Sequence, residues 1–182
     1  MIPAAALVHQ EGVIAVIALV GLSLGSAGIG PSLASRGPLA PALFFGAAVG
    51  AGIFVVVWLF RTVGPLRDLE AWQRKMVTGW SAGDAVAVAV FSGLAEEALV
   101  RALLQPVVGL VPAAAIFAVL HVVPDRKLWA WPAMALLMGL ILGWVFERWG
   151  YPAAAAAHIV INAVSLVRLR SAGGAETNGR AA

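Results

Sequence analysis

The chain has 182 residues, of which 62% are apolar and only 12% are charged, about half the charged share of an average soluble domain. This composition excludes a water-soluble globule and leaves room for at most about seven membrane spans. The chain contains no cysteine, which excludes disulfides, thiolate catalysis, iron–sulfur clusters and Cys-ligated zinc. Its formal net charge of +3 comes from basic residues between and after the apolar runs. That arrangement suits orientation in a bilayer rather than nucleic-acid binding.

Six apolar segments predict membrane spans, although the fourth is short. The first has no Lys or Arg before its apolar run, so we interpret it as a span rather than a cleavable signal peptide. We predict an all-α, polytopic membrane helical bundle of about six transmembrane helices, forming one integral-membrane domain over residues 1–170 with a motif-bearing core at 84–170. The six segments are Gly12 to Ile29, Leu39 to Phe60, Asp84 to Leu104, Pro112 to Val123, Leu128 to Phe146 and Tyr151 to Leu169.

Two segments outside the spans have signatures of their own. Between the second and third spans, Arg61 to Ser81 alternates charged residues with Leu, Met and Trp, which is typical of an amphipathic helix lying on the membrane surface. Residues 171–182 are rich in glycine and small polar residues, the composition of a disordered C-terminal tail.

Pairs of glycines four residues apart allow two helices to approach closely. With 20 glycines in the chain, about two such pairs arise by chance, so we draw no helix contact from them. The pairs are Gly21 with Gly25, Gly46 with Gly50, and Gly139 with Gly143.

The basic residues predict an orientation, because Lys and Arg stay on the cytoplasmic side in short loops. With six spans and the N-terminus inside, nine basic residues fall on the cytoplasmic side. Only Arg36 and Arg148 fall outside, and Arg101 lies within the membrane. We therefore expect both termini to be cytoplasmic.

The third span carries Glu96, Glu97 and Arg101. Three isolated central charges cost roughly 9 kcal/mol, whereas the apolar residues of this span return only about 4 to 5 kcal/mol. Glu97 and Arg101 are four residues apart and share a helix face, so we predict a desolvated ion pair. Glu96 points about 100° away, toward Ser92 and Gly93, whose small side chains leave space for water or a thin substrate. The alternative is a purely structural charge network.

Two histidines lie in predicted spans, His121 in the fourth and His158 in the sixth, and Asn162 follows His158 by one turn. A single histidine within a membrane more often packs between helices than acts in catalysis, and an asparagine there often forms only an interhelical hydrogen bond. However, Glu97, His121 and His158 all lie roughly 10 to 14 Å from the loops that we place outside. This shared depth favours one polar site formed by the third, fourth and sixth helices.

These residue types are able to hydrolyse an amide bond. Glu96 would take a proton from water held by His121, and His158 with Asn162 would donate to the oxyanion of the tetrahedral intermediate. A serine mechanism is not expected, because Ser92 and Ser165 lack an obvious base and no Gly-x-Ser-x-Gly is present. Zinc held by Glu96, His121 and His158 with one open position is the alternative. The residue pattern alone leaves both mechanisms open.

Three motifs in this order on hydrophobic helices resemble those of the CPBP family of intramembrane proteases, which comprises CAAX prenyl proteases and bacteriocin-processing (Abi) proteins. The resemblance covers about Asp84 to Arg170, nearly half of the chain. Each motif is weak alone, and the ordered set is fairly specific. The motifs are Glu96-Glu97-x-x-x-Arg101, Phe117-x-x-x-His121 and His158-x-x-x-Asn162.

The resemblance implies a multi-pass membrane endopeptidase, usually described as glutamate-type and sometimes as metal-dependent. It implies Glu96 as catalytic base assisted by His121, with His158 and Asn162 as the oxyanion site. Glu97 and Arg101 would then be supporting residues. The expected substrate is a membrane-associated protein or peptide, prenylated or C-terminally anchored, and the expected location is a bacterial cytoplasmic membrane.

Two other functional classes fit the same charges. Intramembrane Glu, Arg and His also mark ion pathways, so a small transporter or proton-relay protein is one alternative. A non-catalytic scaffold or immunity protein that keeps the helical bundle is the other. The Glu96→Gln variant separates the three classes, because proteolysis, proton movement and scaffolding depend on that carboxyl differently.

Overall fold

The computed structural model describes residues 2–178. Within these residues the named elements are all helices, which confirms the all-α prediction; the β pairing there is limited to one isolated bridge between Ser35 and Gly150. The elements are α1 (Ala4–Leu24), α2 (Ile29–Ser32), α3 (Leu39–Phe60), α4 (Gly64–Met76), α5 (Ala82–Glu97), the π-helix η1 (Ala98–Leu104), α6 (Gln105–Val108), α7 (Leu110–Leu120), the 3₁₀ turn η2 (Arg126–Leu128), α8 (Ala130–Trp149) and α9 (Tyr151–Asn178).

Four helices are long and apolar enough to cross a membrane: α1, α3, α8 together with η2, and α9. The chain is therefore a multi-pass membrane protein. The region of the third predicted span is helical from Ala82 to Val108 but contains buried charges. The helix α7 has only 11 residues, fewer than the roughly 20 that cross a bilayer. The count of six spans stays a prediction.

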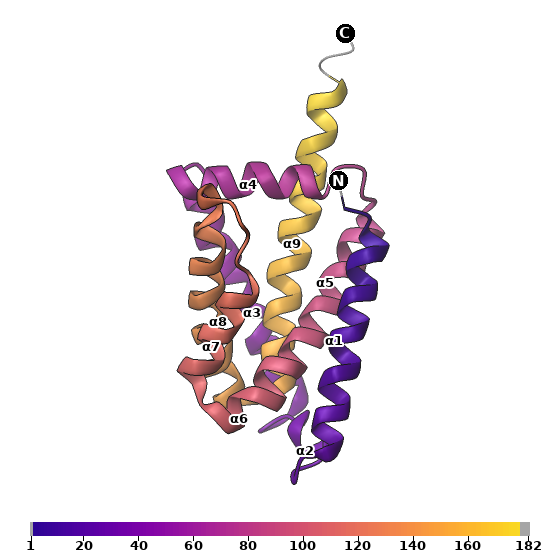
Figure 1. Ribbon diagram of the computed structural model, residues 1–182, viewed down its shortest axis with the longest axis vertical. Coiled ribbons are helices and arrows are strands. Elements are labelled where there is room, and N and C mark those ends of the chain that lie inside the picture. Colours follow the sequence, from indigo (N-terminus) through magenta and orange to yellow (C-terminus); the bar gives the residue numbers. More distant parts are fainter. Residues whose placement is uncertain (1, 179–182) are drawn as a thin grey trace.

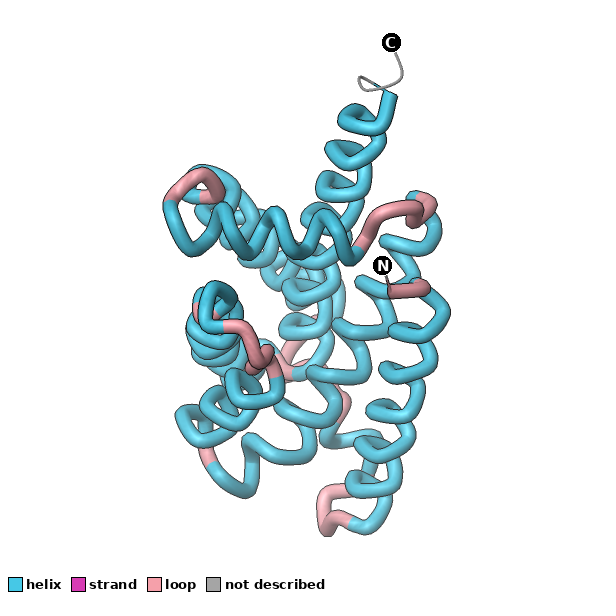
Figure 2. The backbone as a smooth tube through the Cα atoms, turned by 45° about the horizontal axis from the view of Figure 1, so that its top comes forward, coloured by secondary structure: helices cyan, strands magenta, loops and turns pink. Residues whose placement is uncertain are grey.

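Helix α9 runs through the middle of the bundle (Figure 1). It packs against α3, α5 and α8, while α1 lies along the outer side of α5 and α7 pairs with α8. Helix α4 lies across one end of the bundle, where it contacts α9 and α8 (Figures 1 and 2). The arrangement agrees with the prediction of an amphipathic helix between the second and third spans.

Close packing between α3 and α9 depends on glycine. A Cβ atom built on Gly46 would lie 2.1 Å from the carbonyl oxygen of Ala153, and one on Gly50 would lie 2.4 Å from that of Ala157. Both distances are far below van der Waals contact, so only glycine permits the two backbones to approach. The expectation that glycine pairs carry no information was therefore wrong for this pair.

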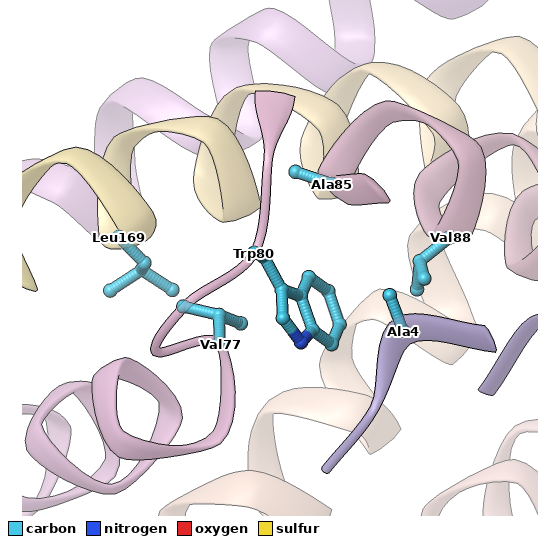
Figure 3. Packing of buried hydrophobic residues seen from close by; sticks show 6 residues of the cluster. All are labelled: Ala4, Val77, Trp80, Ala85, Val88 and Leu169. Carbon is cyan, nitrogen blue, oxygen red and sulfur yellow. The ribbon is translucent and has the colours of Figure 1, made fainter. Parts of the chain in front are cut away.

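The end of the bundle next to α4 is held by an apolar cluster around Trp80 (Figure 3). Residues of α1, of the turn after α4, of α5 and of α9 meet there, and the Trp80 Nε1–H donates to the carbonyl of Ile2 over 2.9 Å. The cluster fixes the start of α1 and the start of α5 at one level. Its buried members are Ala4, Val77, Trp80, Ala85, Val88 and Leu169.

An ion-pair group joins α4 to α9. Glu70 accepts hydrogen bonds from Arg74 (2.6 Å) and from Arg168 Nη2 (2.7 Å). Although partial burial by itself raises the pKa of Glu70, the hydrogen bonds from Arg168 and Arg74 outweigh it and hold the pKa below its ordinary value of 4.5. Glu70 is therefore a carboxylate over the whole physiological range, and it fixes α4 to α9 at Arg168.

Three of the boundaries that differ from the sequence prediction bear on the charged and polar residues or on the predicted tail. The helix α1 begins at Ala4 rather than Gly12, because the charged Glu11 is buried inside the bundle and does not end the span. The helix α7 ends at Leu120, so His121 is its C-terminal cap rather than a residue within it. Helix α9 continues to Asn178, through part of the stretch expected to be disordered, since no proline interrupts its hydrogen-bond ladder. Residues 179–182 lie outside the described residues.

Candidate active site

The predicted ion pair is present at the end of α5. Arg101 Nε donates to Glu97 Oε2 over 2.9 Å, and both side chains are completely buried. The guanidinium carbon also lies 5.4 Å from the centre of the Phe117 ring. A buried pair of this kind is costly to break, because loss of one partner leaves the other charge without compensation.

Arg101 lies in η1, a π-helical stretch that the sequence analysis did not predict. The Gln105 amide there donates to the carbonyl of Val100, five residues back. Pro106 supplies a physical reason, because it has no amide hydrogen for the carbonyl of Ala102 and its ring crowds that turn. Widening the helix relieves this conflict, and such π-bulges are frequent at functional sites.

His158 of α9 lies between the two adjacent glutamates of α5. Its Nδ1 is 2.9 Å from Glu97 Oε1, and its Nε2 is 4.0 Å from Glu96 Oε2. Glu97 thus binds both Arg101 and His158, whereas Glu96 has no such pair of cations. The contact with Glu97 was not predicted, because residues 61 positions apart in sequence meet only once α5 and α9 have packed.

Asn162, one turn further along α9, donates from Nδ2 to Ser92 Oγ over 2.9 Å. The predicted free space beside Ser92 and Gly93 does not exist. A Cβ atom on Gly93 would lie 2.5 Å from Cγ1 of Ile159, which shows that α9 occupies it. Small residues on α5 allow α9 to approach, and they do not leave room for substrate.

His121 lies at the C-terminal end of α7, where one of its two ring nitrogens has a backbone partner. Its Nδ1 lies 2.8 Å from the carbonyl oxygen of Phe117, so Nδ1 carries the proton and the lone pair of a neutral ring is on Nε2. The Phe117 ring lies near both imidazoles, with its centre 4.5 Å from that of His121 and 6.2 Å from that of His158.

A cavity of about 180 Å³ brings three of the four predicted catalytic residues together. His121, His158 and Asn162 line it, and so does Ser165. Glu96 and Glu97 are not among its lining residues, and Glu96 lies next to His158, which does line it. Along α9 the lining extends from His158 to Leu169, about 16 Å at the helical rise, toward the end of the bundle that α4 covers. Side chains from α3, α4 and α8 form the remaining wall, including Phe54, Trp58, Leu69, Met138 and Leu142.

The arrangement of donor groups does not fit the zinc site considered from sequence. Among residues 2–178, no group of three or more His, Cys, Asp or Glu side chains is placed to hold a metal ion. Both histidines use Nδ1, His158 on Glu97 and His121 on a backbone carbonyl. These bonds leave both Nε2 atoms free, as in many metal sites, but the described residues bring no third ligand close to them. We therefore derive no chemical step through a metal.

The sequence analysis missed Glu11, which belongs to the same charge cluster. Its side chain is 5% exposed and lies within hydrogen-bonding range of Glu96. The signal that would have found it is the buried stripe of α1, in which Ala4, Glu11 and Ala18 recur every seven residues. Beginning the span at Gly12 hid this periodicity.

Residues 78–164 match the protein family described as Type II CAAX prenyl endopeptidase Rce1-like. This match supports the assignment of the chain to the CAAX protease family. The match covers nearly half of the chain and includes the three motifs from Glu96 to Asn162, which the structure gathers around α9. Neither the curated proteins nor the solved structures gave a match. Membership in the CAAX protease family supports a membrane-embedded protease that acts on a membrane-associated protein.

Proposed function

We propose that this CAAX protease family member is a glutamate-type intramembrane endopeptidase in which Glu96 activates the attacking water. The observation that carries the proposal is the position of His158, which lies between Glu96 and Glu97 and lines a cavity together with His121 and Asn162. Two imidazoles and an amide line this cavity, and the Glu96 carboxylate lies next to one of the imidazoles; together these are the groups that amide hydrolysis needs.

The contacts of the two adjacent glutamates favour Glu96 as the general base. Glu97 is fully buried and binds both Arg101 and His158, so its lone pairs are already engaged. Glu96 keeps 18% of its side chain exposed. Its Oε2 is buried and has no donor among the described residues, so Oε1 is the oxygen that water can reach. A base needs an oxygen free to accept a proton, and only Glu96 offers one.

The two histidines and Asn162 supply the remaining roles. The Nε2 lone pair of His121 accepts a hydrogen bond from the attacking water. Asn162 uses one N–H on Ser92, and its second N–H is available for the oxyanion. His158 Nε2, when protonated, is the second donor. Each donor of this kind contributes about 10²- to 10³-fold to kcat.

The reaction then proceeds in two balanced steps. The water oxygen bonds to the carbonyl carbon of the substrate while Glu96 takes the water proton, and the carbonyl oxygen becomes the oxyanion held by Asn162 and His158. The intermediate collapses when the C–N bond breaks and Glu96 returns the proton to the departing amine. The products are a carboxylic acid and an amine, and Glu96 is a carboxylate again.

The shape of the cavity favours a substrate that approaches from the α4 side. The cavity runs along α9 toward α4 and is walled largely by apolar side chains. In the orientation that the basic residues predict, α4 lies at the cytoplasmic surface. A prenylated or C-terminally anchored protein would enter there with its apolar part against α3 and α8.

The Glu96→Gln variant tests this function. We expect protein termini that depend on the wild-type chain to disappear from cells that produce Glu96→Gln, because an amide cannot accept the water proton. Mass spectrometry of protein termini measures this, and a thermal unfolding curve in detergent checks the fold. The matched control is Glu147→Gln, an exposed glutamate of α8 that does not line the cavity.

Three other outcomes are informative. Unchanged termini in Glu96→Gln cells would contradict Glu96 as base. Proton flux in proteoliposomes that stops in Glu96→Gln, without any wild-type-dependent termini, would indicate a transporter or proton relay. A cellular phenotype that survives Glu96→Gln would indicate a scaffold.

A further inference from the structure

Glu11 is a buried acid on a helix that none of the proposed catalytic roles involves. It lies on α1, which packs against α5 and η1, and it shares a buried face with Ala18 and Leu22. The charged or titratable residues of α1 are His9, which is exposed, and Glu11 itself. A lone carboxyl in such surroundings costs several kcal/mol if it is charged and unpaired.

The side chain of Glu11 meets the side chain of Glu96. The two carboxyl groups lie within hydrogen-bonding range of each other. Among residues 2–178, Oε2 of each is buried and has no N–H or O–H donor. A hydrogen bond between two carboxyl groups exists only when one of them carries a proton. The geometry therefore calls for one proton between the pair.

The charges around the pair decide where that proton resides. Glu97 and Arg101 neutralise each other, and His158 bonds to Glu97 while its Nε2 faces Glu96. Glu96 is thus the carboxyl next to a ring nitrogen, and Glu11 is the one set among apolar groups of α1. Two carboxyl groups in contact in a low-dielectric site do not both ionise. The charge belongs on Glu96 and the proton on Glu11.

We propose that Glu11 is a positioning residue of the active site, which donates its proton in a hydrogen bond to Glu96 and so holds the Glu96 carboxylate in one orientation. The inference rests on the proposed role of Glu96 as base. Glu11 does not itself contact substrate, because it does not line the cavity. It acts by fixing which oxygen of Glu96 faces the water.

The first test needs no substrate. Infrared spectra of the purified wild-type protein at neutral pH are expected to contain the C=O absorption of a protonated carboxyl group, and this band is expected to disappear in Glu11→Gln. A band that is missing from the wild type, or unchanged in Glu11→Gln, would overturn the shared proton.

The second test is a double-mutant cycle with thermal unfolding as the readout. Glu11→Met and Glu96→Met should each lower Tm, because each leaves the other carboxyl without its partner. The double variant should recover part of the loss, because two apolar side chains then face each other. Additive changes in Tm would overturn the contact. The control is Gln10→Met, an exposed neighbour on α1.

The third test separates positioning from a structural role. Glu11→Gln keeps a donor for Glu96 and is expected to retain most of the wild-type kcat. Glu11→Met removes the donor, and we expect kcat to fall about 10- to 100-fold with KM unchanged, because the base is misplaced. Equal activity in both variants, or a change in KM alone, would contradict the proposal. Because the infrared and Tm measurements need no activity, a failure of Glu96 as base remains distinguishable from a failure of the pair.

Discussion

Two groups of glutamate and arginine side chains contact α9, and they differ in the balance of charge. At the α4 end, one carboxylate, Glu70, receives two guanidinium groups, Arg74 and Arg168. In the middle of the bundle, Glu11, Glu96 and Glu97 share one guanidinium and one imidazole. The first group has cations in excess, so both oxygens of the Glu70 carboxylate are paired with arginine. The second has acids in excess, which leaves one carboxyl oxygen free for proton transfer.

Burial reinforces this difference. The side chains around Glu70 are partly exposed, so water screens them and each contact is worth little. Glu97 and Arg101 are completely buried, where removal of one partner strands the other. The same residue types therefore fasten a surface helix in one place and form the proposed catalytic site in the other.

The largest effect is expected from breaking the buried pair. Arg101→Met leaves Glu97 with only His158, and we expect a loss of about 3–5 kcal/mol in the free energy of unfolding, with low folded yield. Denaturant titration in detergent measures it, with Glu147→Gln as control. A loss below about 1 kcal/mol would show that Glu97 does not depend on Arg101.

An intermediate effect is expected at the oxyanion position. Asn162→Ala should lower kcat about 10²- to 10³-fold with little change in KM, because a donor to the oxyanion acts in the transition state. Steady-state kinetics on a substrate found from the protein termini measures this. Ser165→Ala, which changes another cavity-lining residue one turn away, should keep its activity. A similar loss in both variants would indicate a general packing defect instead.

The smallest effect is expected at the surface group. Glu70→Gln should cost about 1 kcal/mol or less at neutral pH, because partly exposed ion pairs contribute little. The pKa of Glu70 is lowered in the folded state, so its contribution is fully present above the ordinary value of 4.5. It is lost as the pH falls through the lowered folded pKa.

Stability measured against pH checks this sign. The difference in Tm between wild type and Glu70→Gln should be constant above about pH 5 and should shrink toward zero in acid. Arg168→Gln should reproduce part of the loss, because it removes the contact with α9 and leaves Arg74 in place. A difference that grows in acid would contradict the assignment.

Patterns within one helix made much of the structure predictable. Leu39 to Phe60 was predicted with the bounds that α3 has, because a long apolar run needs no tertiary context to be recognised. The Glu97–Arg101 pair followed from the four-residue spacing. The surface position of α4 followed from its alternation of charged and apolar residues.

Contacts between distant segments were not predictable in the same way. The bond from His158 to Glu97 and the contact of Glu11 with Glu96 depend on how helices rotate about their axes, which a span prediction does not specify. The start of α1 was misplaced at Gly12, because Glu11 was assumed to lie outside the span. Glycine is so frequent in this chain that the four-residue spacing of Gly46 and Gly50 did not by itself indicate a contact. The structure shows that both glycines face the α9 backbone, which the sequence does not reveal.

The two halves of α3 differ in how closely they pack against α9. Gly46 and Gly50 lock the first half onto α9 backbone to backbone, while Phe54, Val57 and Trp58 in the second half form a wall of the cavity. If the cavity receives substrate as proposed, a bulky group would press that second half outward toward the lipid. Bilayer stiffness would therefore set an elastic cost for large substrates, and thinner or more fluid membranes would admit them more readily.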